Sequence, residues 1–264
     1  MIMVRTRQVT PAAPRDDAQV DSLRRGLEVL RLFDLRHRKL TLADIARKLD
    51  LSRPTTEKLV QTLQSQHFLQ ATGNDSYEPH IACLTIGRAA KKGLAVAQAA
   101  RPLMRELSER FGVHVTLSAR DRLHMLVVEH CVPPGRVQLG LTSGARFPMA
   151  ASASGRAYLW ARPQEQRSEL LDMIEGEAPS GASHQLTDIL AAFRELETTG
   201  CCYLAAPVAT HTASIATPVK AGSAFALAAM AVSAEVTEAV MRSQVAPVLL
   251  AMAEHIALSS EEEN

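Results

Sequence analysis

The clearest hydrophobic pattern in the chain lies between residues 41 and 63, where apolar side chains recur at helical spacing in two short runs. The first run is Leu42, Ile45, Ala46 and Leu49, and the second is Leu59, Val60 and Leu63. Each run gives a short helix one face that can be buried. Only residues 50–52 separate the two helices, so the pattern predicts a helix-turn-helix.

Polar residues mark the start of both helices. Thr41 precedes the first helix, and Asp44 follows three positions later, where its carboxylate can bond to the amide of the cap residue. Ser52 is suited to cap the second helix, and Pro54 falls in the first turn, where a missing N–H costs nothing. The outer face of the second helix is then left with Arg53, Thr55, Thr56, Lys58 and Gln61.

Patterns on both sides extend this motif. A helical run starts at Val20 and continues to about Leu35, and it would support the helix-turn-helix. Two short extended runs, 68–70 and 77–79, flank the turn-forming sequence Gly73-Asn74-Asp75 and predict a β-hairpin. Three helices followed by a hairpin make a winged helix-turn-helix over residues 20–80. Residues 1–19 have no periodicity and are expected to be a disordered arm.

The pattern changes in the second part of the chain. Residues 81–99 are expected to be a linker helix, after which Pro102 opens a helix that stops at Gly112. Alternating and β-prone runs predict strands at 113–118, 123–128, 137–141, 202–208, 214–219 and 224–232. Further helices are predicted to begin near Ser154, Pro163 and Leu186, with a last one from about 235 to 256. Such an order predicts an α+β domain over residues 100–260.

Composition and charge narrow the possible functions. The chain has 264 residues, of which 47% are hydrophobic, so two domains with helix-rich packing are expected. Residues 1–80 contain 13 Lys+Arg and 10 Asp+Glu, whereas residues 81–264 contain 16 and 18. The sign of this asymmetry suits an N-terminal part that binds nucleic-acid phosphates. No apolar run is long enough for a membrane span or a signal peptide, so a cytoplasmic location is expected.

The residue patterns of metal sites and of enzymes are weak. Cys83, Cys131, Cys201 and Cys202 are scattered and form no metal-binding spacing, so we expect neither a metal nor a cofactor. In the segment 140–144 the serine is displaced by one position from a Gly-x-Ser-x-Gly nucleophile motif. We therefore do not expect an enzyme. A hydrolase-like or protein-binding module in the α/β domain remains the alternative.

Several motifs resemble those of one family. Residues 20–30, 40–46 and 51–55 resemble the N-terminal signature of the IclR family, and Ser154-Gly155-Arg156-Ala157 and residues 215–219 are similar to its Ser-Gly-Lys-Ala and Ile-Ala-Ala-Pro-Val motifs. The resemblance implies a bacterial transcription regulator, usually a repressor. It implies a winged helix-turn-helix, a linker helix and a C-terminal GAF-like α/β effector-binding domain with a central antiparallel sheet. It also implies homodimers that pair into tetramers.

The resemblance places the second helix of the helix-turn-helix in the major groove of double-stranded DNA. Arginine or lysine there can reach guanine O6 and N7, and a threonine methyl group can contact thymine. Ser52 and the wing residue Asn74 are expected to meet phosphates. The predicted DNA-binding set is Ser52, Arg53, Thr55, Thr56, Lys58, Gln61 and Asn74. A two-fold symmetric protein would bind a palindromic operator. The chain departs from the family at Asp50 and His67, where glycine is usual, and at Lys58, where arginine is usual.

The resemblance also implies an effector pocket between the sheet and the loop before the helix that starts near Ser154. A helix start offers free N–H groups to an anion. The predicted effector-binding set is Ser152, Ala153, Ser154, Gly155, Leu204, Ser214 and Ser233. Leu204 stands where the family often has an acidic residue, and Ala206-Pro207 replaces a frequent Glu pair. We therefore expect a small, partly apolar organic acid or an aromatic catabolite as the effector.

Overall fold

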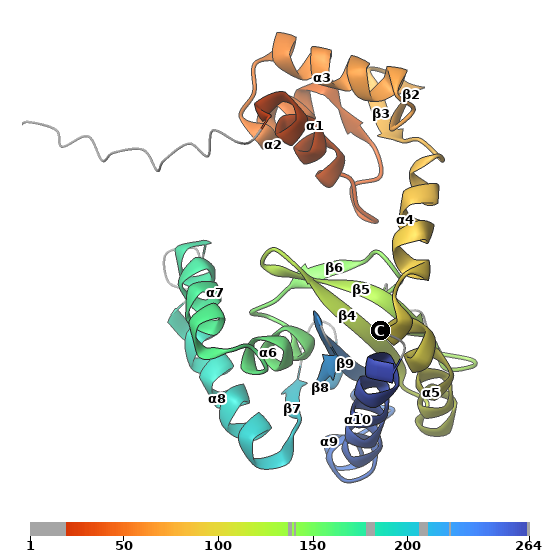
Figure 1. Cartoon of the computed structure of the whole chain (residues 1–264), viewed down its shortest axis with the longest axis vertical. Helices are drawn as coiled ribbons and strands as arrows, with labels where there is room; N and C mark the ends of the chain where they lie inside the picture. Colours follow the sequence, from red (N-terminus) through yellow and green to blue (C-terminus); the bar gives the residue numbers. More distant parts are fainter. Residues whose placement is uncertain are drawn as a thin grey trace, which may run out of the picture. The chain divides into compact units, whose positions relative to one another are not determined.

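The computed structural model describes residues 20–136, 139, 141–177, 183–205, 211–221 and 223–262. The arm predicted at 1–19 and most of the strand predicted at 137–141 lie outside these ranges. The chain divides into two compact units, an N-terminal unit (Met1–Cys83) and a C-terminal unit (Leu84–Asn264) (Figure 1). No helix among the described residues is long and apolar enough to cross a membrane.

The N-terminal unit is a winged helix-turn-helix. Its elements are α1 (Asp21–Arg31), β1 (Leu40–Thr41), α2 (Leu42–Leu49), α3 (Arg53–Ser65), β2 (Leu69–Gly73) and β3 (Ser76–Pro79). The strands form an antiparallel sheet in the order β1-β3-β2. Buried apolar side chains from all three helices and from the sheet form one core, made of Val29, Leu40, Leu42, Ile45, Val60 and Leu69. The predicted architecture of this part is confirmed.

Local hydrogen bonds explain where these helices start and end. The Thr41 hydroxyl accepts a bond from the Asp44 N–H at 3.1 Å, and Asp44 Oδ2 accepts one from the Thr41 N–H at 3.3 Å, so the predicted capping box is present. Asp50 ends α2 in the left-handed conformation with φ of 51°. α1 ends at Arg31, earlier than the predicted Leu35, because Asp34 Oδ1 accepts bonds from the Arg36 and His37 N–H groups and holds a turn.

Two helices precede the sheet of the C-terminal unit. α4 (Cys83–Lys92) and α5 (Ala95–Phe111) are separated at Gly93-Leu94, so the helix predicted over 81–99 breaks earlier than expected. Pro102 does not open a helix, as predicted, but lies inside α5. The helix continues through it because one face of α5 is buried, with Met104 and Leu107 at most 1% exposed. This burial offsets a proline penalty of about 3 kcal/mol.

A six-stranded antiparallel sheet forms the centre of the C-terminal unit, in the order β6-β5-β4-β9-β8-β7. The strands are β4 (His114–Asp121), β5 (His124–Cys131), β6 (Arg146–Pro148), β7 (Cys202–Ala205), β8 (Thr212–Ala221) and β9 (Ser223–Val232). The strands expected near 113–118, 123–128, 202–208, 214–219 and 224–232 correspond to β4, β5, β7, β8 and β9. β6 pairs with β5 as an edge strand that the sequence pattern did not predict.

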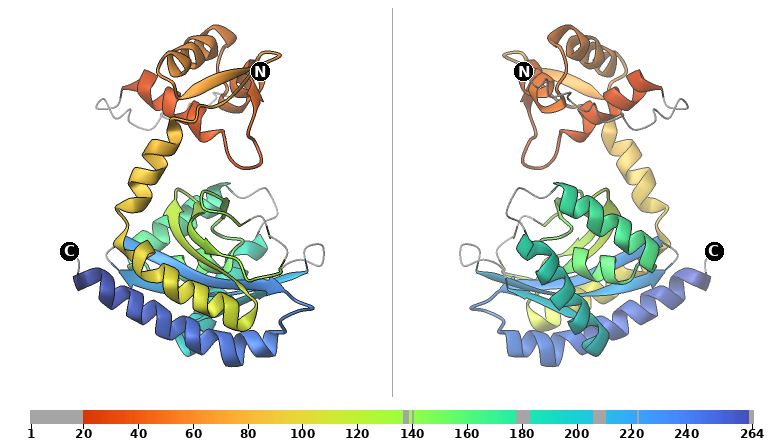
Figure 2. Two further views of the ribbon diagram at one scale, coloured as in Figure 1. Left: turned by 90° about the vertical axis from the view of Figure 1, so that its right-hand side faces the viewer. Right: turned by 90° about the vertical axis from the view of Figure 1, so that its left-hand side faces the viewer.

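Helices cover both faces of this sheet (Figure 2). One face packs against α5 and α10 (Ala246–Glu262), which α9 (Glu238–Val240) and a π-helical turn (Met241–Val245) precede. The other face packs against α6 (Ala153–Trp160), α7 (Gln164–Glu177) and α8 (Ser183–Thr199). Alternate residues of one strand serve the two cores: Ile215 of β8 belongs to the first and Ala216 to the second. The fold is the predicted α+β architecture.

Candidate nucleic-acid interface and effector pocket

The start of α3 is fixed by its cap. The Ser52 hydroxyl accepts a bond from the Thr55 N–H at 3.4 Å and lies 2.8 Å from the Thr55 hydroxyl. Thr56 is fully buried, and its hydroxyl donates to the Ser52 carbonyl at 3.0 Å. Thr56 therefore faces the core of the unit and cannot contact a base, which corrects its predicted role. Its position one turn before the buried Val60 is the signal that could have revealed this.

The outer face of α3 carries the other predicted residues. Arg53, Lys58 and Gln61 are exposed, and a rotation of about 100° per residue places them within one arc of roughly 140°. Neither Arg53 nor Lys58 forms an ion pair with the described residues. Glu57 lies in the same arc and accepts a bond from Gln61 Nε2 at 3.4 Å. Arg53 and Lys58 thus place two unpaired positive charges on this face, beside the Gln61 side chain, which its hydrogen bond to Glu57 orients.

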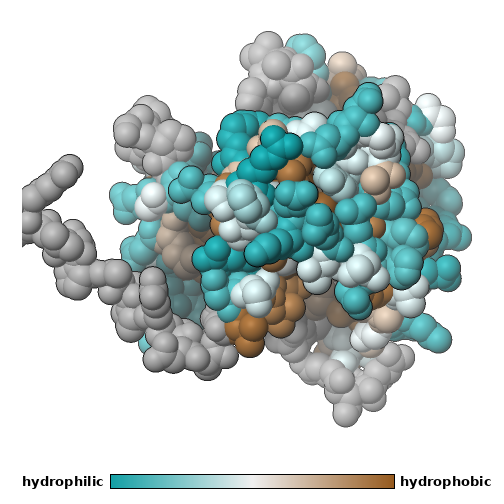
Figure 3. Space-filling model, turned by 90° about the horizontal axis from the view of Figure 1, so that it is seen from above, coloured by the Kyte–Doolittle hydropathy of each residue, from teal (hydrophilic) through white to brown (hydrophobic). Residues whose placement is uncertain are grey.

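The wing lies after α3 in the same unit. Asn74 and Asp75 both have positive φ, at 51° and 54°, which is the conformation of a tight hairpin turn. The Asn74 side chain is exposed at this tip. His67, at the position where the family usually has glycine, also has positive φ, at 57°. Viewed from the side of α3, at the top of Figure 1, the surface is mainly hydrophilic (Figure 3).

In the C-terminal unit, four predicted effector residues form the start of α6. Ser152 caps this helix: its hydroxyl accepts from the Gly155 N–H at 3.1 Å, and its carbonyl accepts from the Arg156 N–H at 3.1 Å. Ala153, Ser154 and Gly155 are buried. A Cβ atom added to Gly155 would lie 2.1 Å from the Met149 carbonyl oxygen, so only glycine allows the loop to approach the helix this closely.

Arg156 adds a buried cation that was not in the predicted set. It is 8% exposed, its Nε donates to the Ala150 carbonyl at 3.1 Å, and its guanidinium lies 3.5 Å from Asp188 Oδ2 of α8. Asp188 is exposed, so solvent screens much of this ion pair. The arginine in the Ser-Gly-Arg-Ala motif was the available signal. It places a positive charge beside the start of α6.

The late strands place only two of the remaining predicted residues together. Leu204 of β7 and Ser214 of β8 are paired across the sheet, and Ser214 is 7% exposed. The start of α6 reaches the same strand, because Cys202 Sγ donates to the Ala153 carbonyl at 3.4 Å. Ser233 follows the end of β9, is exposed, and donates its N–H to the His211 carbonyl at 2.7 Å. It does not join this face of the sheet, and Ala206-Pro207 lie outside the described residues.

The structure adds polar residues that the sequence analysis did not select. His114, Thr116 and Ser118 alternate along β4, are at most 4% exposed, and lie on the sheet face that packs against α6. His130 of β5 lies beside them, with Nε2 3.1 Å from His114 Nδ1. The alternation of these residues in the sequence is the signal that points to a shared face of the strand.

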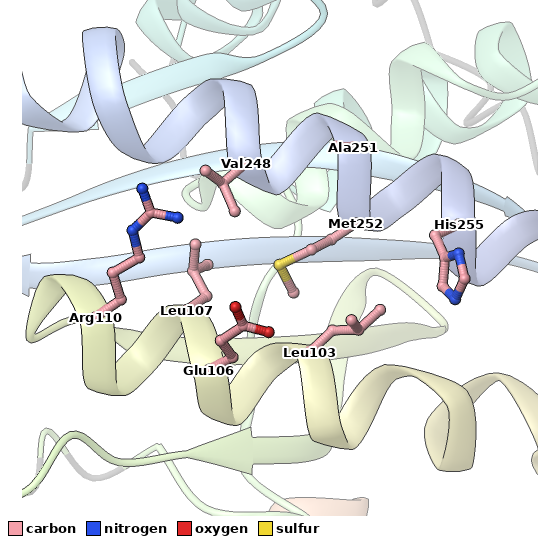
Figure 4. Close-up of a pocket in the computed structure, with 8 residues that line it drawn as sticks. All are labelled: Leu103, Glu106, Leu107, Arg110, Val248, Ala251, Met252 and His255. Atoms are coloured by element: carbon pink, nitrogen blue, oxygen red, sulfur yellow. The ribbon is translucent and has the colours of Figure 1, made fainter.

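Two hollows lie on the other side of the sheet. A groove of about 210 Å³ runs between α5 and α10, where Glu106, Arg110 and His255 surround apolar side chains (Figure 4). A wider hollow of about 540 Å³ lies at α4 and α5 and contains the ion pair of Lys91 Nζ with Glu129 Oε2 at 2.9 Å. Within the described residues, no group of three or more His, Cys, Asp or Glu could hold a metal ion.

A capped recognition helix with an exposed basic face, a supporting core and a wing defines the class of DNA-binding transcription regulators. Residues 22–73 match the "IclR helix-turn-helix domain", and residues 88–258 match the family described as "Bacterial transcriptional regulator IclR C-terminal". The chain therefore belongs to the IclR family of bacterial transcription regulators.

Relatives and solved structures agree with this assignment. The chain is 31% identical to the HTH-type transcriptional regulator TsaQ1/TsaQ2 of Comamonas testosteroni over 58% of this chain and 56% of that protein. Its fold is similar to an IclR family regulator from Brucella abortus, with 28% identity, a TM-score of 0.83 and coverage of 92% of this chain and 94% of that one. An IclR homolog from Microbacterium hydrocarbonoxydans has the same fold, with 20% identity, a TM-score of 0.70 and coverage of 91% and 99%.

Proposed function

We propose that this regulator is a repressor that binds a palindromic operator as a homodimer and is controlled by a small organic or aromatic acid. The observation that carries the DNA-binding part is the exposed face of α3, where Arg53 and Lys58 lie on a helix that Ser52 caps. Arg53 and Lys58 are proposed to reach base edges, with Gln61 beside them. Ser52 and the wing residue Asn74 are proposed to contact phosphates, which would fix the register of the helix, and the Thr55 methyl group is proposed to contact a thymine.

The experiment for this part is a gel shift with a fragment upstream of the protein's own gene. The double variant Arg53→Ala/Lys58→Ala is compared with Arg110→Ala/Lys220→Ala, which removes the same charge from exposed positions of the C-terminal unit. If each lost contact costs about 1–3 kcal/mol, operator affinity falls at least about 30-fold in the first variant. The control should bind as the wild type does. Unchanged binding by the first variant would refute the assigned face.

Association is proposed to use exposed apolar side chains of α1 in the N-terminal unit and, separately, of α4 in the C-terminal unit. Leu23 and Leu27 of α1 are 61% and 52% exposed, and Leu84 and Ile86 of α4 are 55% and 58% exposed. Exposed large apolar side chains in clusters are typical of interaction surfaces. Light scattering should show at least a dimer, and Leu23→Glu/Leu27→Glu should weaken it. A monomer at operator-binding concentrations would contradict the dimer.

The effector is proposed to bind between the start of α6 and the late strands. Three observations support this site: the capped helix start, the buried cation of Arg156, and the adjacent pair of Leu204 and Ser214. The homolog from Microbacterium hydrocarbonoxydans was crystallised with 4-hydroxybenzoate, which supports an aromatic acid here. Calorimetry with a panel of acids tests the proposal. Heat from glyoxylate or pyruvate and none from larger acids would contradict it.

A further inference from the structure

A row of residues crosses the centre of the sheet on the face that packs against α6. Leu204 pairs with Ser214, Ser214 with Met230, and Met230 with His114. Directly paired residues of antiparallel strands point to the same face. The next row along β8 and β9 contains Ala216 and Ala228, which belong to the core around α6. His114 therefore lies on the same face as the proposed effector contact Ser214, two strands away.

The β4 side of this face is polar although it is buried. His114, Thr116 and Ser118 are 3%, 4% and 0% exposed. A buried polar group costs free energy unless it is hydrogen-bonded. The Ser118 hydroxyl has no hydrogen-bond partner among the described residues. The polar strip on β4 thus contains a group that a bound polar molecule would satisfy.

The two imidazoles at the end of this strip form a defined hydrogen-bonding unit. His114 Nδ1 and His130 Nε2 are 3.1 Å apart, and the rings are stacked with centroids 5.3 Å apart. Burial, together with the neighbouring His114, lowers the pKa of His130 to about 4, so His130 is neutral at pH 7. A neutral imidazole has one donor and one acceptor nitrogen. The bond to His114 uses Nε2, so Nδ1 of His130 takes the opposite role: it donates if Nε2 accepts, and it accepts if Nε2 donates.

We propose that His130, positioned by His114, hydrogen-bonds a hydroxyl group of the effector, which makes the effector a hydroxy-substituted aromatic acid. A hydroxyl group both donates and accepts, so it suits either state of a neutral imidazole, whereas a carboxylate only accepts. This inference rests on the proposed function, because it concerns the same effector site.

The dimensions of the row agree with such a ligand. Two interstrand spacings, about 10 Å, separate Ser214 from His114, and His130 lies on the next strand, about 5 Å further, with its Nε2 3.1 Å from His114 Nδ1. An aromatic ring with a carboxylate at one end and a hydroxyl at the other can span much of that distance. Met230, which lies between them, supplies a thioether for contact with the ring. The carboxylate is then directed to Ser214 and the start of α6.

The test is calorimetry of the full-length protein with four acids: 4-hydroxybenzoate, 3,4-dihydroxybenzoate, benzoate and 4-methylbenzoate. The methyl group of the last has nearly the shape of the hydroxyl but cannot form hydrogen bonds. Wild-type protein should bind 4-hydroxybenzoate at least about tenfold more tightly than 4-methylbenzoate. His130→Phe should reduce that ratio to about one while 4-methylbenzoate still binds. His130→Gln keeps a hydrogen-bonding group and should retain part of the preference.

His124→Phe is the matched control. His124 lies on β5 next to Met125, whose side chain belongs to the core around α6, so the His124 side chain lies on the face of the sheet opposite to His130. His124→Phe should keep the wild-type ratio. A gel shift with the operator fragment verifies that each variant is folded. Equal affinity of the wild type for the hydroxyl and methyl acids, or an unchanged ratio in His130→Phe, overturns this inference alone. No binding of any of the four acids overturns it together with the effector part of the proposed function.

Discussion

The ion pair between Lys91 and Glu129 leads to a prediction about stability that depends on which partner is removed. The Glu129 side chain is 7% exposed, and the Lys91 side chain is 40% exposed. Lys91→Met leaves a buried carboxylate without its cation, whereas Glu129→Gln leaves a lysine that can turn to solvent. The two variants remove the same ion pair but should differ in stability, because only the first leaves a buried charge uncompensated.

The expected magnitude follows from burial. Breaking a fully buried ion pair costs about 3–5 kcal/mol, but solvent already reaches Lys91, so we expect about 1–3 kcal/mol for Lys91→Met. For a unit of this size, 1 kcal/mol corresponds to about 2–4 °C in Tm. Glu129→Gln should cost less than about 1 kcal/mol. The double variant should be more stable than Lys91→Met alone, since the unpaired charge is gone.

Thermal and urea unfolding of the four proteins measures these differences. Lys92→Met is the control: it is the exposed neighbouring lysine and has no ion pair with the described residues. Its cost should stay within about 0.5 kcal/mol. The reasoning fails if Lys91→Met is no less stable than Lys92→Met, or if adding Glu129→Gln to Lys91→Met restores nothing.

Three further predictions concern other residues. Gly155→Ala should destabilise the C-terminal unit by about 3 kcal/mol or more, because its Cβ would meet the Met149 backbone, whereas Gly176→Ala, with open space around it, should not; urea unfolding compares them. Burial and the neighbouring His114 hold the pKa of His130 near 4 in the folded state, below its ordinary 6.5. The unfolded chain therefore binds a proton more readily, and the free energy of unfolding should fall by about 1–2 kcal/mol as pH drops from 6.5 towards 4. His130→Phe should lose that pH dependence. Burial raises the pKa of Cys201 and Cys202 to about 12, so mass spectrometry after thiol labelling at pH 8 should find both unmodified until urea is added; labelling in the native protein would contradict their burial.

The helix-turn-helix could be predicted because its determinants are local. Thr41, Asp44 and Ser52 form the hydrogen bonds that their spacing predicts, and Asp50 adopts the left-handed conformation at the turn. The prediction for Thr56 is wrong because its position on α3, and not its polar residue type, decides which face it lies on. It lies one turn before Val60, and its hydroxyl bonds to its own helix, which lets it be buried at little cost.

The polar strip of β4 could not be assigned from the pattern alone. Alternation of polar and apolar residues predicts a strand, and it also suggests that the polar side faces solvent. In this unit helices cover both faces of the sheet, so the polar side of β4 is buried as deeply as the apolar side. The pair of His114 and His130 is formed by residues 16 positions apart, and only strand pairing brings their rings together.

β5 contacts residues on both faces of the sheet through Glu129 and His130. Glu129 and His130 are consecutive, so the pleat directs Glu129 towards α4 and α5 and His130 towards the proposed effector site. A ligand bound at His130 can shift α4 only if its affinity differs between two arrangements of the protein in which β5 is placed differently. The ion pair of Lys91 with Glu129 joins α4 to β5, so it is a contact through which such a shift would reach α4. The double variant Lys91→Met/Glu129→Gln should therefore bind 4-hydroxybenzoate as the wild type does, while the ligand's effect on operator affinity in the gel shift is reduced. If that effect is unchanged, the Lys91–Glu129 contact does not carry the coupling.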